Sequence, residues 1–170
     1  FVQMQERGVA PDMITYTCML IVCGRIGAIG KGKSIHADIE KKGMFENDCI
    51  VGNALVDMYS KCGALEKARH VFEHLPARNV VSWTAIITGY TQQGFGHEAL
   101  KCFRQMQESK VIPNAITYIS ILKACGMTGS LAVGEKIDAE VRKQGLVFKD
   151  ITLGNSLVAM YVKCGALEKA

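Results

Sequence analysis

Two kinds of short helix alternate in the pattern of apolar and polar residues. The first kind is apolar along much of its length, with residues at helical spacing, as in Leu55, Val56, Met58, Tyr59 and again in Ile86, Ile87, Tyr90. The second kind is amphipathic, with apolar residues at i, i+1, i+4 and i+7. One such helix has Ala99, Leu100, Phe103 and Met106 on its apolar face and Glu98, Lys101 and Arg104 towards solvent. The pattern therefore predicts helices in pairs.

The chain repeats itself at an offset of 102 residues. The segment 61–68 recurs letter for letter as 163–170, and residues 13–68 match residues 115–170 at 27 of 56 positions. Similar starting segments divide this period further, into units 13–48, 49–79, 80–114 and 115–150, flanked by the incomplete pieces 1–12 and 151–170. A pair of short helices cannot bury its apolar faces alone, so neighbouring units must stack. We expect an all-α solenoid of helical hairpins, wound as a right-handed superhelix.

Several glycines come near the predicted end of the first helix in each unit. They are Gly24, Gly63, Gly94 and Gly126. A glycine at this place is typical of a helix that ends in the left-handed conformation.

Because both ends of the chain interrupt a unit, we expect it to be a piece of a longer solenoid, and its uncovered ends to favour self-association.

Composition adds few constraints. The chain is 49% hydrophobic and 21% charged, which excludes a disordered chain, and it has no long uncharged apolar stretch typical of a membrane span. Its seven cysteines contain no C-x-x-C pair, so free, mostly buried thiols are expected. The net charge of +4 permits binding to a polyanion without requiring it.

Two patterns imitate catalytic or metal sites. Residues 27–34 satisfy the phosphate-loop spacing, but the copy 102 residues later has lost both the lysine and the serine. His70 and His74 are four residues apart without a third ligand at a suitable spacing. We therefore expect no enzyme, no cofactor and no metal.

The units resemble one family closely. The lengths 36, 31 and 35, in this order, and the phrases MYSKCG (58–63) and VVSWTAIITGY (80–90) are similar to plant pentatricopeptide repeat proteins of the PLS class. In that family's terms, 1–12 is the tail of a P motif, 13–48 an L motif, 49–79 an S motif, 80–114 a P motif, 115–150 an L motif and 151–170 a truncated S motif.

The resemblance implies sequence-specific binding of single-stranded RNA, one base per repeat. It also implies that the chain is the recognition module of an organellar factor for RNA processing or C-to-U editing, in a mitochondrion or chloroplast. The deaminase of such factors is a separate domain with an H-x-E and C-x-x-C zinc signature, which this chain lacks. A deaminase domain or an editing cofactor protein is therefore an expected partner.

In this family the fifth and the last residue of each motif read the base. By analogy, Asn53 with Asn79 would prefer a pyrimidine, and Thr84 with Asn114 would prefer adenine, so the core preference is pyrimidine–adenine. Weaker readers are Thr17 with Asp48, for guanine, and the incomplete or impaired sites Asn155, Asp12 and Asp150. Ile119, the fifth residue before Asp150, has no polar group for hydrogen bonding.

The resemblance also assigns stacking and backbone contacts. Ile50, Val81 and Ile116 would sandwich bases, and Lys61, Lys163 and Arg25 would contact phosphates. Each assignment has a plain structural alternative. The last residues of the motifs are favoured helix N-caps, the isoleucines and valine would by default be core, and the lysines would be solvated charges.

A second function from another class is a protein-interaction scaffold. Helical-hairpin solenoids also bind peptides or proteins, and L motifs of the family can dock editing cofactor proteins. The apolar Ile119 fits this alternative. A third alternative is a piece too short to bind RNA with useful affinity, because it holds about two complete base readers. Polar fifth and last residues in register favour RNA.

Overall fold

The computed structural model of the chain describes residues 10–44 and 49–169. These residues form α-helices and one short 3-10 helix, and no strand occurs among them. The chain falls into two compact parts, the N-terminal part Phe1–Ala85 and the C-terminal part Ile86–Ala170.

The N-terminal part contains two helical hairpins and the start of a third. Its elements are α2 (Met13–Ile26), α3 (Ile29–Lys41), α4 (Cys49–Lys61), α5 (Leu65–Glu73) and the first residues of α6 (Val80–Gln92). Helix α2 packs on α4, the first helix of the next hairpin, and each first helix also packs on its own second helix.

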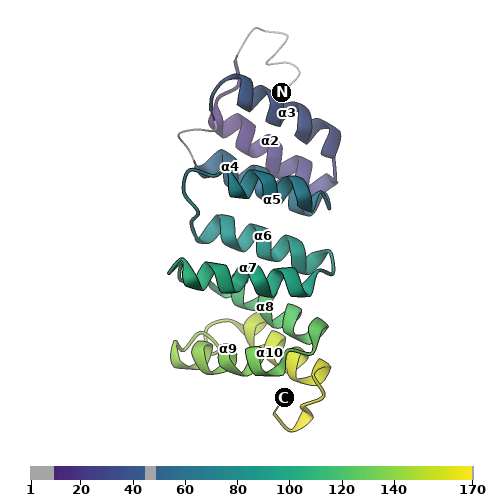
Figure 1. The fold of residues 1–170 in the computed structure, drawn as a ribbon, viewed down its shortest axis with the longest axis vertical. Coiled ribbons are helices and arrows are strands. Elements are labelled where there is room, and N and C mark those ends of the chain that lie inside the picture. The colour runs from purple at the N-terminus through teal and green to yellow at the C-terminus, as the bar shows by residue number, and fades with distance from the viewer. Residues whose placement is uncertain (1–9, 45–48, 170) are drawn as a thin grey trace. The chain divides into compact units, whose positions relative to one another are not determined.

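The C-terminal part follows the same plan (Figure 1). It contains the remainder of α6, then α7 (Gly96–Glu108), α8 (Ala115–Thr128), α9 (Leu131–Lys143), α10 (Ile151–Lys163) and the 3-10 helix η1 (Leu167–Lys169). Helix α8 is central, because it packs on α7, α9 and α10. The predicted all-α fold of repeated helical hairpins is confirmed.

The two predicted apolar faces form the core of each part. The first-helix residues Leu55, Val56, Met58, Tyr59, Ile86, Ile87 and Tyr90 are all buried. On the amphipathic helix α7, Ala99, Phe103 and Met106 are buried, whereas Leu100 is half-buried. Burying a side chain of this size contributes about 1.5–3 kcal/mol, so the repeated faces account for most of the driving force for stacking.

Two of the four glycine predictions are wrong. Gly63 and Gly94 have φ of 73° and 90°, as expected for left-handed helix ends. Gly24 and Gly126 instead lie inside α2 and α8, which run on to the left-handed caps Gly27 and Gly129. A Cβ at Gly24 would lie 3.1 Å from Met58 Cα, so this glycine allows two helices to approach closely.

The cysteines lie at equivalent packing positions of the two copies. The Cys62 thiol lies 3.7 Å from the carbonyl of Cys23, and the Cys164 thiol 3.6 Å from that of Cys125. Burial raises the pKa of the Cys125 thiol to about 12, so this group stays protonated. These two pairs contribute to helix packing in each copy.

The segment with phosphate-loop spacing and the histidine pair both have ordinary structural roles. Residues 27 and 28 join helix α2 to helix α3, and residues 29–34 already belong to α3, so a helix precedes this segment where a phosphate loop requires a strand. The rings of His70 and His74 stack with centroids 4.3 Å apart, and the described residues contain no group of three metal-ligating side chains. In the described part of the chain, no helix has the length and apolar character needed to cross a membrane.

Candidate nucleic-acid interface

The structure brings one predicted reader pair together. Asn53 lies on α4, and Asn79 lies immediately before α6, 26 residues further on. The Asn53 amide nitrogen donates a hydrogen bond to Asn79 Oδ1 at 3.4 Å. The Asn53 Oδ1 atom is buried without a hydrogen-bond partner in the described structure. An unsatisfied buried acceptor costs about 1–3 kcal/mol, so this amide has capacity for a further donor.

The last residues of the predicted motifs are helix N-caps. Asp12, Asn79, Asn114 and Asp150 each accept a hydrogen bond from a backbone N–H two or three residues further on, at 2.8–2.9 Å. Asp48 lies outside the described residues. Each cap engages one side-chain oxygen, which leaves the amide nitrogens of the asparagines and the second oxygens of the aspartates for a ligand. Capping and base reading are therefore compatible.

Two of the predicted fifth residues are threonines with the same local geometry. Thr17 Oγ1 donates to the Met13 carbonyl at 2.8 Å, and Thr84 Oγ1 donates to the Val80 carbonyl at 2.6 Å. Each hydroxyl donates its hydrogen inside its own helix, and a hydroxyl oxygen can by its chemistry also accept a hydrogen bond. Adenine carries an exocyclic amine that can donate to such an oxygen. Thr84 and its predicted partner Asn114 lie in different compact parts.

A small cavity lies between the first helices α8 and α10, beside their packing contact within the C-terminal part. Its volume is about 270 Å³, and its lining includes Ile119, Thr152, Asn155 and Lys163. Small-ligand pockets usually span about 300–1,000 Å³, so this slot suits a small group. The predicted fifth residues of two consecutive units thus line one slot, where Asn155 contributes polar atoms and Ile119 an apolar surface.

The three stacking candidates lie on the surface. Ile50, Val81 and Ile116 are 61%, 53% and 59% exposed, although such residues are usually buried. The core alternative for them is therefore wrong. Each is the second residue of its helix, one turn before the predicted fifth residue. An exposed aliphatic side chain at that place offers an apolar contact for a ligand.

The three phosphate candidates differ in their surroundings. Lys61 Nζ lies 2.6 Å from Asp57 Oδ2, and these side chains are 37% and 32% exposed. Lys163 is the equivalent residue 102 positions later, where Ala159 replaces the aspartate, and the described structure shows no ion pair for it. Arg25 is exposed in the last turn of α2.

The aliphatic side-chain stems of Lys61 and Lys163 each pack against a glycine of the preceding first helix. A Cβ at Gly126 would lie 3.0 Å from Lys163 Cδ, and one at Gly24 would lie 3.4 Å from Lys61 Cδ. Each lysine stem therefore lies across the preceding first helix at a point without a side chain. The aliphatic part of each lysine is therefore packed on a helix, while the residue as a whole stays exposed, as is usual for lysine side chains.

Lys123 and Ser156 line the same slot as Ile119 and Asn155, but sequence reasoning did not single them out. Lys123 is four residues after Ile119 on α8, and residues at this spacing share a helix face. That spacing was a usable signal for Lys123. Ser156 donates its hydroxyl to the Thr152 carbonyl at 2.7 Å and has no comparable signal.

Comparisons with known proteins give one consistent family. A model of the PPR repeat family matches residues 78–127, and a model of the PPR repeat matches residues 14–44 and 53–80. The Arabidopsis thaliana pentatricopeptide repeat-containing protein At3g22690 is 38% identical over the whole chain, which covers 20% of that protein. The chloroplastic Arabidopsis thaliana protein At4g18520 is 37% identical, and the chain covers 27% of it. The chain thus spans about a fifth to a quarter of these curated relatives.

Solved structures agree on the fold. The pentatricopeptide repeat protein PPR10 from maize superposes with a TM-score of 0.69 at 24% identity, covering 98% of this chain and 25% of that one. PPR10 in complex with an 18-nt psaJ RNA element superposes with a TM-score of 0.76, also at 24% identity, covering all of this chain and 25% of that one. At this identity, the similarity concerns the architecture.

Proposed function

Because the chain belongs to the pentatricopeptide repeat family, we propose that it binds single-stranded RNA sequence-specifically, one base per repeat. The observation that carries this proposal is the Asn53–Asn79 pair, in which two polar residues from consecutive hairpins meet beside an unsatisfied amide oxygen. The RNA complex of the similar protein PPR10 supports the same class of ligand.

The proposed motif division is PLS: L at 13–48 and 115–150, S at 49–79 and 151–170, and P at 80–114. Helices α2, α4, α6, α8 and α10 begin at the first residues of these segments, which supports the division. The base preference then follows by family analogy. A pyrimidine would bind at Asn53 and Asn79, and an adenine at Thr84 and Asn114.

The full-length protein would act as an organellar factor in RNA processing or C-to-U editing. Two of its relatives, At4g18520 and At1g15510, are chloroplastic proteins, which supports an organellar location. The part played by this chain would be recognition of the RNA, while any deamination would belong to another domain or protein.

A titration of the purified chain with fluorescently labelled single-stranded RNA tests the proposal. An RNA that contains pyrimidine–adenine should bind more tightly than the permuted sequence, at two salt concentrations. Thr84→Asn should reduce the preference for adenine at one position, by about 1–3 kcal/mol if a good base contact is exchanged. Equal binding of both RNAs at both salt concentrations would reject base reading.

One observation favours protein docking as a second function. Ile119 presents an apolar, half-buried side chain at the fifth position of the second L motif. It cannot hydrogen-bond to a base edge, so this motif could instead contact an editing cofactor protein. If the repeat faces RNA, replacing Ile119 by Asn should add base selectivity there. If it docks a protein, the same replacement should weaken protein binding without any gain in RNA selectivity.

A further inference from the structure

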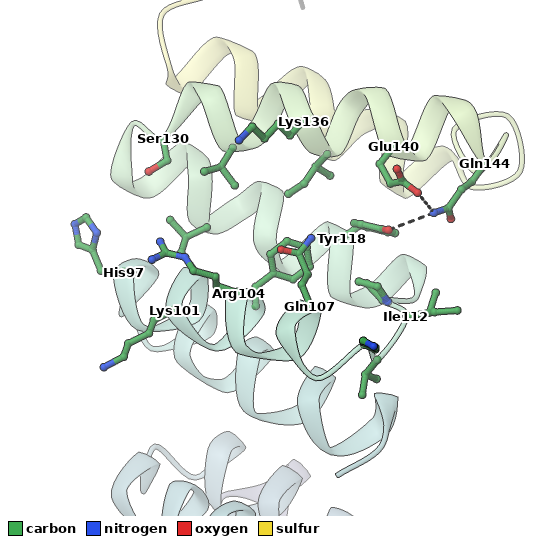
Figure 2. A pocket seen from close by; sticks show the side chains of 17 residues that line it. His97, Lys101, Arg104, Gln107, Ile112, Tyr118, Ser130, Lys136, Glu140 and Gln144 are labelled. Atoms are coloured by element: carbon green, nitrogen blue, oxygen red, sulfur yellow. Dashed lines mark hydrogen bonds between the residues drawn. The ribbon is translucent and has the colours of Figure 1, made fainter.

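A second, larger cavity lies on another side of helix α8. It has a volume of about 870 Å³ and runs between α7 and α9 (Figure 2). Both helices pack on α8, whose Tyr118 forms the floor of the groove. Phe103 of α7 meets Tyr118 edge to face, with ring centroids 6.4 Å apart. Both rings are buried, so the groove has a fixed, packed floor.

The groove carries a surplus of positive charge. Lys101 and Arg104 lie on the α7 side, Lys136 on the α9 side, and Lys110 just after α7. All four are exposed, and none takes part in an ion pair within the described residues. Glu140 is the one carboxylate in the lining, and it already accepts a hydrogen bond from the Gln144 amide. The groove therefore favours an anionic ligand.

Aliphatic side chains occupy the space between these charges. Leu100 of α7, Val133 of α9 and Val111 are half-buried in the lining, and Ile112 is exposed at its edge. Such a surface gains free energy when it is covered by apolar groups, at about 25 cal/mol per Å². A purely ionic ligand would leave these side chains in water.

We propose that the groove between α7 and α9 binds an acidic, amphipathic helical segment of a partner protein. Its aliphatic side chains would lie on Leu100 and Val133, and its carboxylates would pair with Arg104 and Lys136. Helices α7 and α9 have 13 residues each, about 20 Å, which suits a partner helix of roughly three to four turns. An amphipathic helix in an apolar groove is a common mode of peptide recognition.

The lining favours a protein ligand over RNA. Single-stranded RNA binds best where cations accompany aromatic faces on which bases stack. Phe103 and Tyr118 are only 5% and 3% exposed, so neither ring offers such a face. The proposed base reader Asn155 faces the separate slot between α8 and α10. Protein and RNA would thus occupy different sides of α8.

The test uses a synthetic, fluorescently labelled peptide of 14 residues. Leucines at i, i+3, i+4, i+7 and i+11 give it one apolar face, and glutamates fill most other positions. One control peptide has lysine in place of every glutamate, and another has the same composition in an order without an apolar face. Fluorescence anisotropy should show the acidic amphipathic peptide binding at least about tenfold more tightly than either control.

Variants locate the site. Arg104→Glu with Lys136→Glu should weaken binding of the acidic peptide about tenfold or more. Lys143→Glu with Lys149→Glu makes the same charge change at exposed residues outside the groove, and should alter binding less than about twofold. All four residues are exposed, so both variants should retain the thermal unfolding midpoint of the parent chain.

Three results would overturn the proposal. The acidic peptide could fail to bind at millimolar concentration, or the two peptides without the acidic amphipathic pattern could bind equally well. The groove variant could also weaken RNA binding as strongly as peptide binding, with RNA displacing the peptide, which would make the groove an RNA surface. A failed RNA titration alone leaves this proposal unaffected, because its probe is a peptide.

Discussion

Asp57→Ala should release Lys61, a predicted phosphate contact, from its ion pair. In the first copy of the 102-residue repeat, Lys61 is held 2.6 Å from Asp57, whereas the equivalent Lys163 follows Ala159 and has no such carboxylate. A lysine that already faces a carboxylate gains less from an RNA phosphate, because it must give up one anion to bind another. We therefore expect Lys61 to contribute little to RNA binding in the parent chain, and Lys163 to contribute fully.

The structure sets the size of both effects. The Lys61–Asp57 pair is about one-third exposed and spaced i,i+4, so its loss should lower the free energy of unfolding by only about 0.3–0.5 kcal/mol. One additional phosphate contact steepens the dependence of log K on log salt concentration by about 0.7 for a single strand. Between 50 and 200 mM salt, that slope corresponds to an extra change of about 2.5-fold in affinity.

The assay is the RNA titration repeated across salt concentrations. Asp57→Ala should steepen the slope by about 0.7, and the reciprocal change Ala159→Asp should flatten it by a similar amount through Lys163. Glu66→Ala removes an exposed carboxylate elsewhere on the N-terminal part, and controls for the general gain in positive charge. Urea unfolding of each variant checks that the fold is retained.

Two outcomes would refute this reasoning. If Lys61→Ala flattens the slope in the parent chain as much as Lys163→Ala does, Lys61 contacts a phosphate despite its carboxylate. If Glu66→Ala steepens the slope as much as Asp57→Ala, the effect comes from net charge and the ion pair is irrelevant. Either result would separate the pairing argument from the broader proposal of RNA binding.

Three further predictions follow from local structure. Asn114→Ser should preserve the N-cap and the unfolding midpoint in urea while changing base preference, whereas Asn114→Ala should also lose about 0.5–2 kcal/mol of stability. Gly134→Ala would place a Cβ 2.5 Å from the buried Met160 sulfur and should destabilise the C-terminal part by about 1–3 kcal/mol, measured by thermal unfolding. Gly154→Ala, with open space around it, should stabilise the same part by about 0.5–1 kcal/mol in that measurement. Burial lowers the pKa of His36, so the folded state holds its proton less tightly than the unfolded state; stability should fall as pH drops below about 6.5, and His36→Gln should remove this part of the acid dependence in calorimetry.

Features that depend on nearby residues could be predicted from the sequence. Asp12 and Asn114 cap their helices through backbone groups three residues away, so local order is enough to identify them. The i,i+4 spacing of Asp57 and Lys61 was also a usable signal for their ion pair, although Lys61 was predicted only as a phosphate contact or a solvated charge. The prediction failed at Gly24, because a local rule for glycine cannot reveal the approach of α4.

Features that depend on packing could not be predicted in this way. Asn53 and Asn79 are 26 residues apart, and only the register of the repeats suggested that they act together. The groove between α7 and α9 is formed by three helices and by the segment that follows α7. The sequence alone suggests an ordinary solvent-exposed face for Lys101 and Arg104. Their significance depends on Lys136, which lines the same groove from α9 (Figure 2).

The two copies of the repeat show which positions can change without disturbing the fold. Tyr59 OH lies 3.0 Å from His36 Nδ1, and the equivalent Tyr161 OH donates to Asp138 at 2.8 Å, so one buried hydroxyl is satisfied by two different side chains. Packing at such positions tolerates a change of chemistry when the geometry is kept.

The predicted fifth positions of the repeats also combine similar burial with different side-chain chemistry. Asn53 and Thr84 are covered to nearly the same degree, at 9% and 8% exposure, although one carries an amide and the other a hydroxyl. Because an amide side chain is buried to the same degree at the equivalent position, we expect Thr84→Asn to alter hydrogen bonding more than packing. An unchanged unfolding midpoint together with a changed base preference would identify Thr84 as a base-reading residue. A loss of stability without any change in preference would mean that its role is structural.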